Sequence, residues 1–153
     1  MPTTITRQIV VDKLKTVLQT VRKSAGYYTD LGAKVESWRL KSYFKNTAAA
    51  INIKDRSDVS DLDAEDESLE THSLNVELEL LFKAAVSDEE ARKGIADVKK
   101  AVATLEADAT WNGLVDRVRP DGDEMDVAED EDRIAGVTVK LVVEFLTQAF
   151  QEA

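Results

Sequence analysis

The first part of the chain carries one clear helical pattern of hydrophobic residues. Apolar side chains recur at spacings of three and four between residues 5 and 21, which places them on one face of a helix. They are Ile5, Ile9, Val10, Leu14, Val17, Leu18 and Val21. Glycine is typical of the position just after a helix, and Gly26 follows this pattern closely. The pattern therefore predicts a helix over residues 5–24 that Gly26 ends.

Four later segments alternate between apolar and polar residues, as strands do. The clearest is 73–83, where every second side chain is apolar, and a second long alternation covers 137–146. Shorter alternations of mixed polarity cover 33–41 and 48–54. Segment 73–83 has one apolar face and one mostly polar face, which is typical of a sheet covered by helices on one side.

A second helix is indicated by its start signal and by an apolar stripe. The capping box Ser87-Asp88-Glu89-Glu90 places an N-cap serine three residues before a glutamate. The stripe that follows has helical spacing and consists of Ala91, Ile95, Val98, Val102 and Leu105. Together these features predict a helix over residues 88–107.

Between this helix and the last strand the signals are weaker. Residues 114–119 are compatible with a strand, the sequence Pro120-Asp121-Gly122-Asp123 predicts a turn, and the acidic residues after it suit either an edge strand or a loop. The order along the chain is thus helix, strands, helix, strands. This order predicts an α+β fold, with two helices packed on one face of a mostly antiparallel mixed sheet, in a single domain covering 1–153.

Composition excludes several classes of protein. The chain has 153 residues, of which 43% are hydrophobic, as expected for one globular domain. It contains no cysteine, which excludes disulfides, thiolate nucleophiles and cysteine-ligated metals. No apolar run is long enough to cross a membrane. Because no dinucleotide, P-loop or nucleophile-elbow motif is present either, we expect no enzyme activity, no cofactor and no metal.

Charge is distributed unevenly along the chain. The totals are 20 basic and 30 acidic residues, a net charge of −10. The first 50 residues carry nine basic and three acidic side chains, a net of +6, while acidic residues concentrate in 55–70 and 121–132. We expect residues 55–70 to form a solvated loop or the tip of a hairpin. Both acidic stretches would then meet a basic partner or line a channel. Such acidity opposes general binding to nucleic-acid phosphates.

Two further features suggest chemistry only weakly. His72 is the single histidine, and it is in phase with the apolar face of segment 73–83. We interpret it as a structural residue at a strand end, because nothing in the sequence sets up a nucleophile beside it. The sequence Asp61-x-Asp63-x-Glu65 is similar to the start of a calcium loop, but Asp66 stands where such a loop needs glycine.

Aromatic residues cluster in the basic first third of the chain, which is typical of an interface. Trp38 is equally compatible with a core position. The candidate interface residues are Tyr27, Tyr28, Asp30, Trp38 and Arg39. The candidates for an acidic loop that faces a lumen or a partner are Asp121, Asp123, Glu124, Asp126, Glu129 and Asp130.

Four segments, taken in order, resemble one protein family. They are Ile5-Thr6-Arg7-Gln8-Ile9-Val10, then Gly26-Tyr27-Tyr28-Thr29-Asp30-Leu31-Gly32-Ala33-Lys34-Val35, then Ala96-Asp97-Val98-Lys99-Lys100-Ala101, and finally Arg133-Ile134-Ala135-Gly136-Val137-Thr138-Val139. The second segment looks like a "GYxTDxGxxV" loop. With this spacing, the chain resembles the tail terminator (tail completion, minor tail protein U-like) proteins of long-tailed bacteriophages, although it has Thr47-Ala48-Ala49 where members often have a proline.

The resemblance implies a structural protein of the virion tail and neck, assembled in the host cytoplasm. It implies an α+β subunit that forms a hexameric homo-oligomeric ring at the head-proximal end of the tail tube. The ring would stop tube polymerisation and present the joining surface for head-completion or connector proteins. DNA would only pass through the lumen, and an acidic lumen would repel its phosphates. The alternative, from the residues alone, is an acidic soluble binding or adaptor module that recognises a basic protein.

Overall fold

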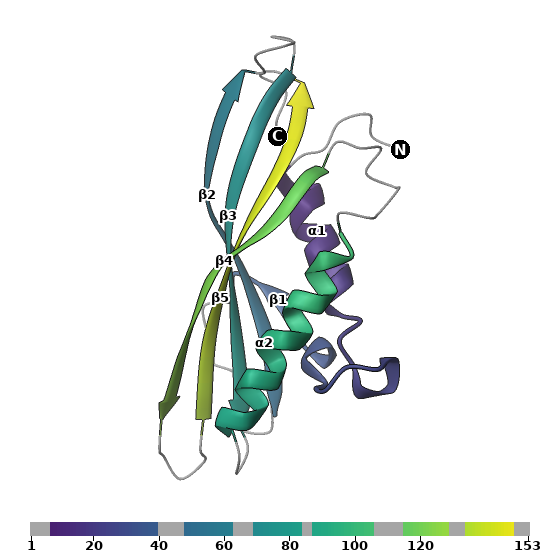
Figure 1. Cartoon of the computed structure of the whole chain (residues 1–153), viewed down its shortest axis with the longest axis vertical. Coiled ribbons are helices and arrows are strands. Elements are labelled where there is room, and N and C mark those ends of the chain that lie inside the picture. Colours follow the sequence, from purple (N-terminus) through teal and green to yellow (C-terminus); the bar gives the residue numbers. More distant parts are fainter. Residues whose placement is uncertain are drawn as a thin grey trace.

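A mixed sheet forms the centre of the molecule, and the helices lie against it (Figure 1). The computed structural model describes residues 7–39, 48–62, 69–83, 87–105, 115–128 and 134–148. In this part of the chain the strands are β1 (Val35–Ser37), β2 (Ala49–Leu62), β3 (Leu69–Lys83), β4 (Val115–Ala128) and β5 (Ile134–Gln148), and the α-helices are α1 (Arg7–Leu18) and α2 (Ser87–Ala103). The predicted α+β class is therefore confirmed.

The strand order in the sheet is β1-β2-β3-β5-β4. The β1–β2 pair is parallel and the other pairs are antiparallel, so the sheet is mixed but mostly antiparallel, as predicted. In the central strand β3, Leu78 lies opposite Ile53 of β2 and Val139 of β5. The sheet edges are β1 and β4, which are far apart in the sequence and different in length.

The hydrophobic core lies between the helices and one face of the sheet. Helix α2 contacts β3, β4 and β5, and helix α1 contacts α2, β1 and β2. The alternating apolar residues of β3 and β5 are buried on this face, together with the apolar stripes of both helices. Full burial of a leucine or valine side chain contributes roughly 1.5–3 kcal/mol. This shared core explains why both helices pack on the same face.

The first helix is shorter than predicted. Helix α1 ends at Leu18, although Val21 is still buried, and residues 5 and 6 lie outside the described part of the chain. A 3-10 turn, η1 (Lys23–Ala25), follows, and Gly26 ends this turn rather than the α-helix, with a left-handed φ of 93°. A later loop packs against the chain just after the helix: the N–H of Gly32 donates to the oxygen of Val21, and Gly32 lies close to the carbonyl oxygens of Leu18 and Gln19.

The predicted strand over 33–41 is much shorter in the structure. The 3-10 turn η2 (Leu31–Ala33) occupies its start, and among the described residues of this segment the paired strand is β1 (Val35–Ser37). Residues 40 and 41 lie outside the described ranges. Strand β1 ends because Trp38 has a φ of 51°, in the left-handed region that a strand cannot contain. The backbone N–H of Trp38 still donates to the carbonyl oxygen of Ile53 in β2.

Of the two interpretations of 55–70, a loop is wrong for the residues that the structure describes, whereas a hairpin agrees with the antiparallel pairing of β2 and β3. Strand β2 continues to Leu62, and β3 begins at Leu69, with Leu62 opposite Glu70. A shift in register between Asp55 and Asp58 marks a β-bulge. Tertiary pairing overrides the weak strand propensity of this stretch, because its charged residues find partners on β3 and α1. Residues 63–68 lie outside the described ranges.

The predicted turn at Pro120-Asp121-Gly122-Asp123 is also wrong, because the chain does not reverse its direction there. Residues 115–128 form one strand, β4, with a register shift between Pro120 and Asp123. Gly122 has a φ of 97°, so the turn residues bend the strand as a bulge instead of ending it. The edge-strand interpretation of the acidic segment is thus confirmed up to residue 128, and the loop interpretation is wrong there.

The remaining elements agree with the predictions apart from their ends. Helix α2 covers Ser87–Ala103, β3 extends the predicted 73–83, and β5 extends the predicted 137–146. Within the described ranges, no helix is both long and apolar enough to span a membrane.

Candidate functional site

The loop between η1 and β1 is attached to helix α2 through one buried carboxylate. Asp97, only 2% exposed, accepts a hydrogen bond from the backbone N–H of Tyr28 at 3.0 Å. Its other oxygen accepts two more from Thr29, at 2.8 Å from the backbone N–H and at 2.7 Å from the hydroxyl. A buried carboxylate is stable only when such donors replace water. Asp97 therefore determines the position of this loop.

The other distinctive residues of the loop also have structural roles. Asp30 accepts a hydrogen bond from the backbone N–H of Lys23 at 2.9 Å, which closes the loop on itself. Gly32 lies against the end of α1, where an added Cβ would come within 2.6 Å of the carbonyl oxygen of Gln19. Gly26 supplies the left-handed conformation that turns the chain into the loop. The loop is thus a well-defined unit built from local and long-range contacts.

The two tyrosines of this loop have different environments. Tyr27 is half-buried against the core, and the ammonium group of Lys100 lies 4.8 Å from the centre of its ring. Tyr28 is 66% exposed, although Asp97 holds its backbone. Of the pair, Tyr28 is therefore the residue that is available to a partner.

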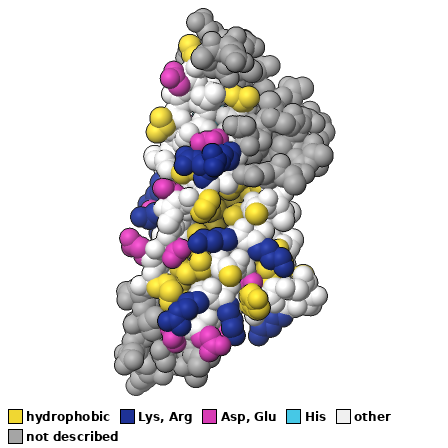
Figure 2. Space-filling model, viewed as in Figure 1, with side chains coloured by type: hydrophobic (Ala, Val, Ile, Leu, Met, Phe, Trp, Pro, Cys, Tyr) yellow, Lys and Arg dark blue, Asp and Glu magenta, His cyan; other side chains and the backbone are white. Residues whose placement is uncertain are grey.

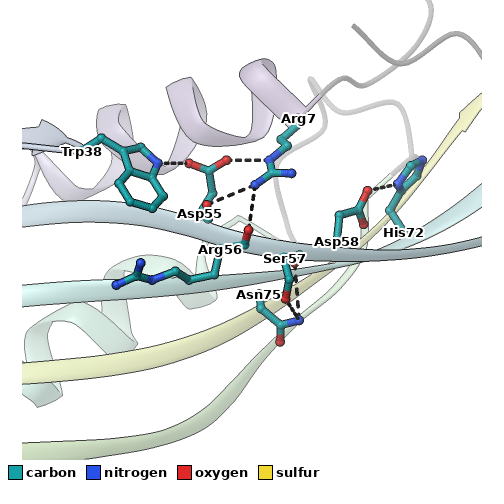
Figure 3. Close-up of polar contacts among 8 residues, drawn as sticks. All are labelled: Arg7, Trp38, Asp55, Arg56, Ser57, Asp58, His72 and Asn75. Atoms are coloured by element: carbon teal, nitrogen blue, oxygen red, sulfur yellow. Dashed lines mark hydrogen bonds and ion pairs between the residues drawn. The ribbon is translucent and has the colours of Figure 1, made fainter.

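Trp38 belongs to a polar cluster that joins α1, β1 and β2 (Figure 3). Its indole N–H donates to Oδ1 of Asp55 at 2.7 Å, and the other carboxylate oxygen accepts from Arg7 at 2.6 Å. Arg7 also donates to the backbone carbonyls of Asp55 and Arg56, next to the bulge of β2. The guanidinium of Arg56 lies 5.1 Å from the centre of the Trp38 ring. The cluster thus supplies hydrogen-bond donors to backbone carbonyls of β2 next to its bulge, close to the end of β1.

The charge of Asp55 depends on this cluster. Burial alone would raise the pKa of its carboxyl, but the hydrogen bonds from Arg7 and Trp38 and the positive charge of Arg7 outweigh it. The pKa therefore lies below the ordinary value of 3.8. With its side chain 14% exposed, Asp55 is a charged and well-partnered structural acid near neutral pH.

A small open pocket lies beside this cluster. Its volume is about 190 Å³, and the lining residues are Arg7, Gln8, Val11, Ser37, Trp38 and Asp55. Sites for small molecules usually have volumes of roughly 300–1,000 Å³. Because its two charged groups already pair with each other, the pocket is better suited to accept one side chain of a partner than a cofactor.

The candidate interface residues fall into two groups with different neighbours. Tyr27, Tyr28 and Asp30 share the loop that α2 holds, whereas Trp38 and Arg39 follow β1 and contact β2. Trp38 is 42% exposed, so the core alternative for it is wrong. Arg39 is half-buried, forms an ion pair with Glu36 at 2.9 Å, and exchanges backbone hydrogen bonds with the buried side chain of Asn52.

His72 lies in the core of the sheet. It is 2% exposed, its ring stacks on Phe145 with 4.7 Å between centroids, and Nδ1 lies 2.5 Å from Oδ2 of Asp58 (Figure 3). The carboxylate of Glu70 is 3.8 Å from Nε2. This burial and stacking agree with the structural role predicted for the histidine, but its predicted place at a strand end is wrong, because β3 begins at Leu69 and His72 lies within it.

The acidic candidates are placed only in part. Asp121 and Glu124 are exposed on β4, and Asp123 forms an ion pair with Lys99 of α2 at 3.3 Å. Only the backbone of Asp126 is described, and Glu129 and Asp130 lie outside the described residues. No cluster of His, Asp or Glu side chains suited to a metal occurs within the described ranges, which exclude residues 63–66 of the calcium-like sequence.

Sequence reasoning missed several residues on which this arrangement depends, above all Asp97, Arg7 and Asp55. One signal for Asp97 was present: it lies on the same side of the helix as two small residues, Gly94 three positions before it and Ala101 four positions after it. Nothing local to Arg7 or Asp55 indicates their pairing, which joins residues 48 positions apart. Comparison of the sequence with known proteins finds no matching family model and no matching curated protein.

Proposed function

We propose that this protein is a structural component of a phage virion, a tail terminator that forms a ring on the head-proximal end of the tail tube. The ring stops tube polymerisation and offers the joining surface for head-completion or connector proteins. The observation that carries the proposal is the contact between two of the segments on which the family resemblance rests. Segments 26–35 and 96–101 meet through the hydrogen bonds of Thr29 and Tyr28 to Asp97.

This contact supports the proposal because it gives the resemblance a physical reason. Short motifs whose residues share no structural role match a family's motifs by chance alone. Here Gly26, Thr29, Asp30 and Gly32 each have a separate role in one loop, and Asp97 completes it from α2. Together these residues build one three-dimensional unit. That unit also presents Tyr28 to solvent, as a joining or subunit surface requires.

The sheet supports ring assembly through its asymmetry. One edge is the short strand β1 and the other is the long acidic strand β4. A contact between two such different surfaces is head-to-tail, and head-to-tail contacts close into rings when the rotation per copy allows it.

Electron microscopy of tails assembled without this protein tests the proposal. Overlong tubes, or tubes that fail to join heads, are the expected result, and adding back the purified wild-type protein should restore normal tails. Tails of normal length that join heads in its absence would contradict the proposal. Light scattering after gel filtration, with and without purified tail tubes, provides the second measurement: the protein should form a ring on its own or on the tubes.

The adaptor alternative has one observation in its favour, the exposed carboxylates Asp121 and Glu124 on β4. An adaptor would stay monomeric at all concentrations, would leave tails unchanged, and would bind a basic protein with a strong salt dependence. The same two experiments therefore separate the two functions.

A further inference from the structure

We propose that the loop around Tyr28 is a docking surface for a second copy of this chain, and that it receives the acidic edge strand β4 of that copy. That copies associate at all rests on the proposed ring. The choice of surfaces rests on the exposure, charge and position of the described residues.

The loop offers an aromatic anchor that is exposed but already ordered. Tyr28 is 66% exposed, while its own N–H and both donor groups of Thr29 are bound to Asp97. Tyrosine is enriched among the residues that dominate binding energy in protein interfaces. An anchor whose backbone is held before binding loses little conformational entropy on association. Tyr28 thus combines an exposed aromatic side chain with a backbone that is held in place.

The surroundings of Tyr28 carry more basic than acidic charge, with Asp30 as the exposed acid of the loop. Arg22 and Lys23 lie just before the loop, and Lys100 of α2 lies beside the ring of Tyr27. All three basic residues are exposed. None of the ion pairs between described residues involves them, and the side chain of Arg22 donates a hydrogen bond to the backbone carbonyl of Gln19. Figure 2 shows Lys and Arg side chains among hydrophobic ones, with some Asp or Glu side chains beside them, on the lower half of the molecule, where α2 and this loop lie in Figure 1. A complementary partner surface is therefore acidic.

Strand β4 provides such a surface at the sheet edge. Asp121 and Glu124 are exposed, have no ion-pair partner among the described residues, and are close in sequence to Met125, which is 37% exposed. Acidic charges and a bulge on an edge strand oppose pairing between two identical edges. Strand β4 is consequently poorly suited to contact β4 of another copy, and well suited to a basic surface with an apolar residue at its centre.

The two surfaces lie at opposite edges of the sheet. The loop leads directly into β1 at one edge, and β4 forms the other. In Figure 1 the η1–η2 loop lies at the lower right and the lower end of β4 at the lower left. One copy can therefore use both surfaces at once, which gives the head-to-tail contact that a ring requires.

Paired charge reversals test this contact. The variant R22E/K23E makes both surfaces acidic, and D121K/E124K makes both basic. Each variant alone should associate at least tenfold more weakly than wild type by light scattering, because like charges then face each other. An equal mixture of the two variants should assemble again, and so should one chain that carries all four changes. Exposed Asp12 and Asp61 provide a control, D12K/D61K, with the same change in net charge as D121K/E124K and no expected effect.

Tyr28→Ala tests the anchor separately. The side chain is mostly exposed, so the urea midpoint should not change while association weakens at least tenfold. Circular dichroism and urea unfolding of every variant exclude misfolding as the cause of lost assembly.

The outcomes separate this inference from the proposed function. If wild type assembles but neither charge reversal weakens assembly, the docking inference is wrong and the ring remains. If D121K/E124K assembles normally and instead slows DNA ejection, the acidic residues line the lumen and the docking inference is again wrong. If wild type stays monomeric in solution and on tail tubes, both proposals are wrong. Rescue in the mixture with no assembly of either variant alone would establish the contact.

Discussion

Thr29 and Asp97, 68 residues apart in the sequence, are joined by two hydrogen bonds in the interior of the protein. Both residues are almost completely buried, at 1% and 2% exposure. A charged group in such a place is tolerated because the loop turns its N–H groups and a hydroxyl toward it. The pair therefore links the position of the η1–η2 loop to that of helix α2.

We expect removal of the Asp97 carboxylate to destabilise the protein strongly. Asp97→Ala leaves the donors of Tyr28 and Thr29 buried without acceptors and should lower the free energy of unfolding by about 3–5 kcal/mol. Thr29→Val removes only the hydroxyl and should cost about 1 kcal/mol, while Thr29→Ser should be nearly neutral. Urea unfolding measures all three variants. Equal effects of the two threonine changes would contradict a role for the hydroxyl.

Two glycines in the same loop should differ in their tolerance of a methyl group. In Gly32→Ala the new Cβ would lie 2.6–2.7 Å from the backbone oxygens of Gln19 and Leu18, so α1 or the loop must move. We expect a loss of about 2–3 kcal/mol. Gly26→Ala has free space but keeps a φ of 93°, and should cost about 1 kcal/mol. Thermal unfolding that reverses this order would show that the loop does not pack on α1 as described.

The stability supplied by Asp55 should disappear at low pH. Because its pKa is lowered in the folded protein, the charged form stabilises the fold fully above the ordinary value of 3.8. That contribution is lost as the pH falls below 3.8 toward the folded pKa. Asp55→Asn should therefore be less stable than wild type at pH 7, and the difference should shrink between about pH 4 and pH 2. Urea unfolding across this range measures the difference.

Arg7→Met serves as the matched variant for this prediction. It removes the guanidinium that lowers the pKa of Asp55, so this part of the pH dependence should be much weaker in its background. A constant difference between wild type and Asp55→Asn from pH 7 to pH 2 would contradict the coupling.

The left-handed backbone at Trp38 should reverse the usual order of alanine and glycine. Both Trp38→Ala and Trp38→Gly lose the indole hydrogen bond to Asp55 and the ring contact with Arg56. Only alanine keeps a Cβ at a φ of 51°, so the glycine variant should be more stable by about 1 kcal/mol. Ser37, the preceding residue in β1, has no positive φ and should show the opposite order. Thermal unfolding of the four variants tests this; the same order at both positions would be inconsistent with strain at Trp38.

The fold class and the long elements were predictable from local pattern. The alternation in 73–83 and 137–146 identified β3 and β5, and the stripe after Ser87 identified α2. The errors fall where local preference was overruled by neighbours. The charged residues of β2 from Asp55 to Asp58 look like a loop in sequence, yet they pair with residues of β3 and with Arg7 of α1. The glycine of β4 looks like a turn, yet pairing with β5 on both sides of it makes it a bulge.

For the candidate interface, the sequence supplied only the clustering of its residue types. Clustered aromatics and basic residues indicated a surface of interaction, but not which tyrosine is exposed. That depends on Asp97, which turns the Tyr28 backbone toward α2, and on Lys100, which covers the ring of Tyr27. Trp38 shows the same limit: its sequence context allowed core or interface, and the left-handed end of β1 directs it to the surface.

The sequence by itself determined the α+β class, the helix-covered face of the sheet and the separation of basic and acidic regions, because periodicity and charge are properties of neighbouring residues. The tertiary structure decided the length of β2, the bend in β4, the attachment of the Tyr28 loop and the placement of the basic and acidic surfaces at opposite sheet edges. These features depend on hydrogen bonds and ion pairs between residues such as Thr29 and Asp97, or Arg7 and Asp55. Such partners are brought together only by the packing of the helices on the sheet.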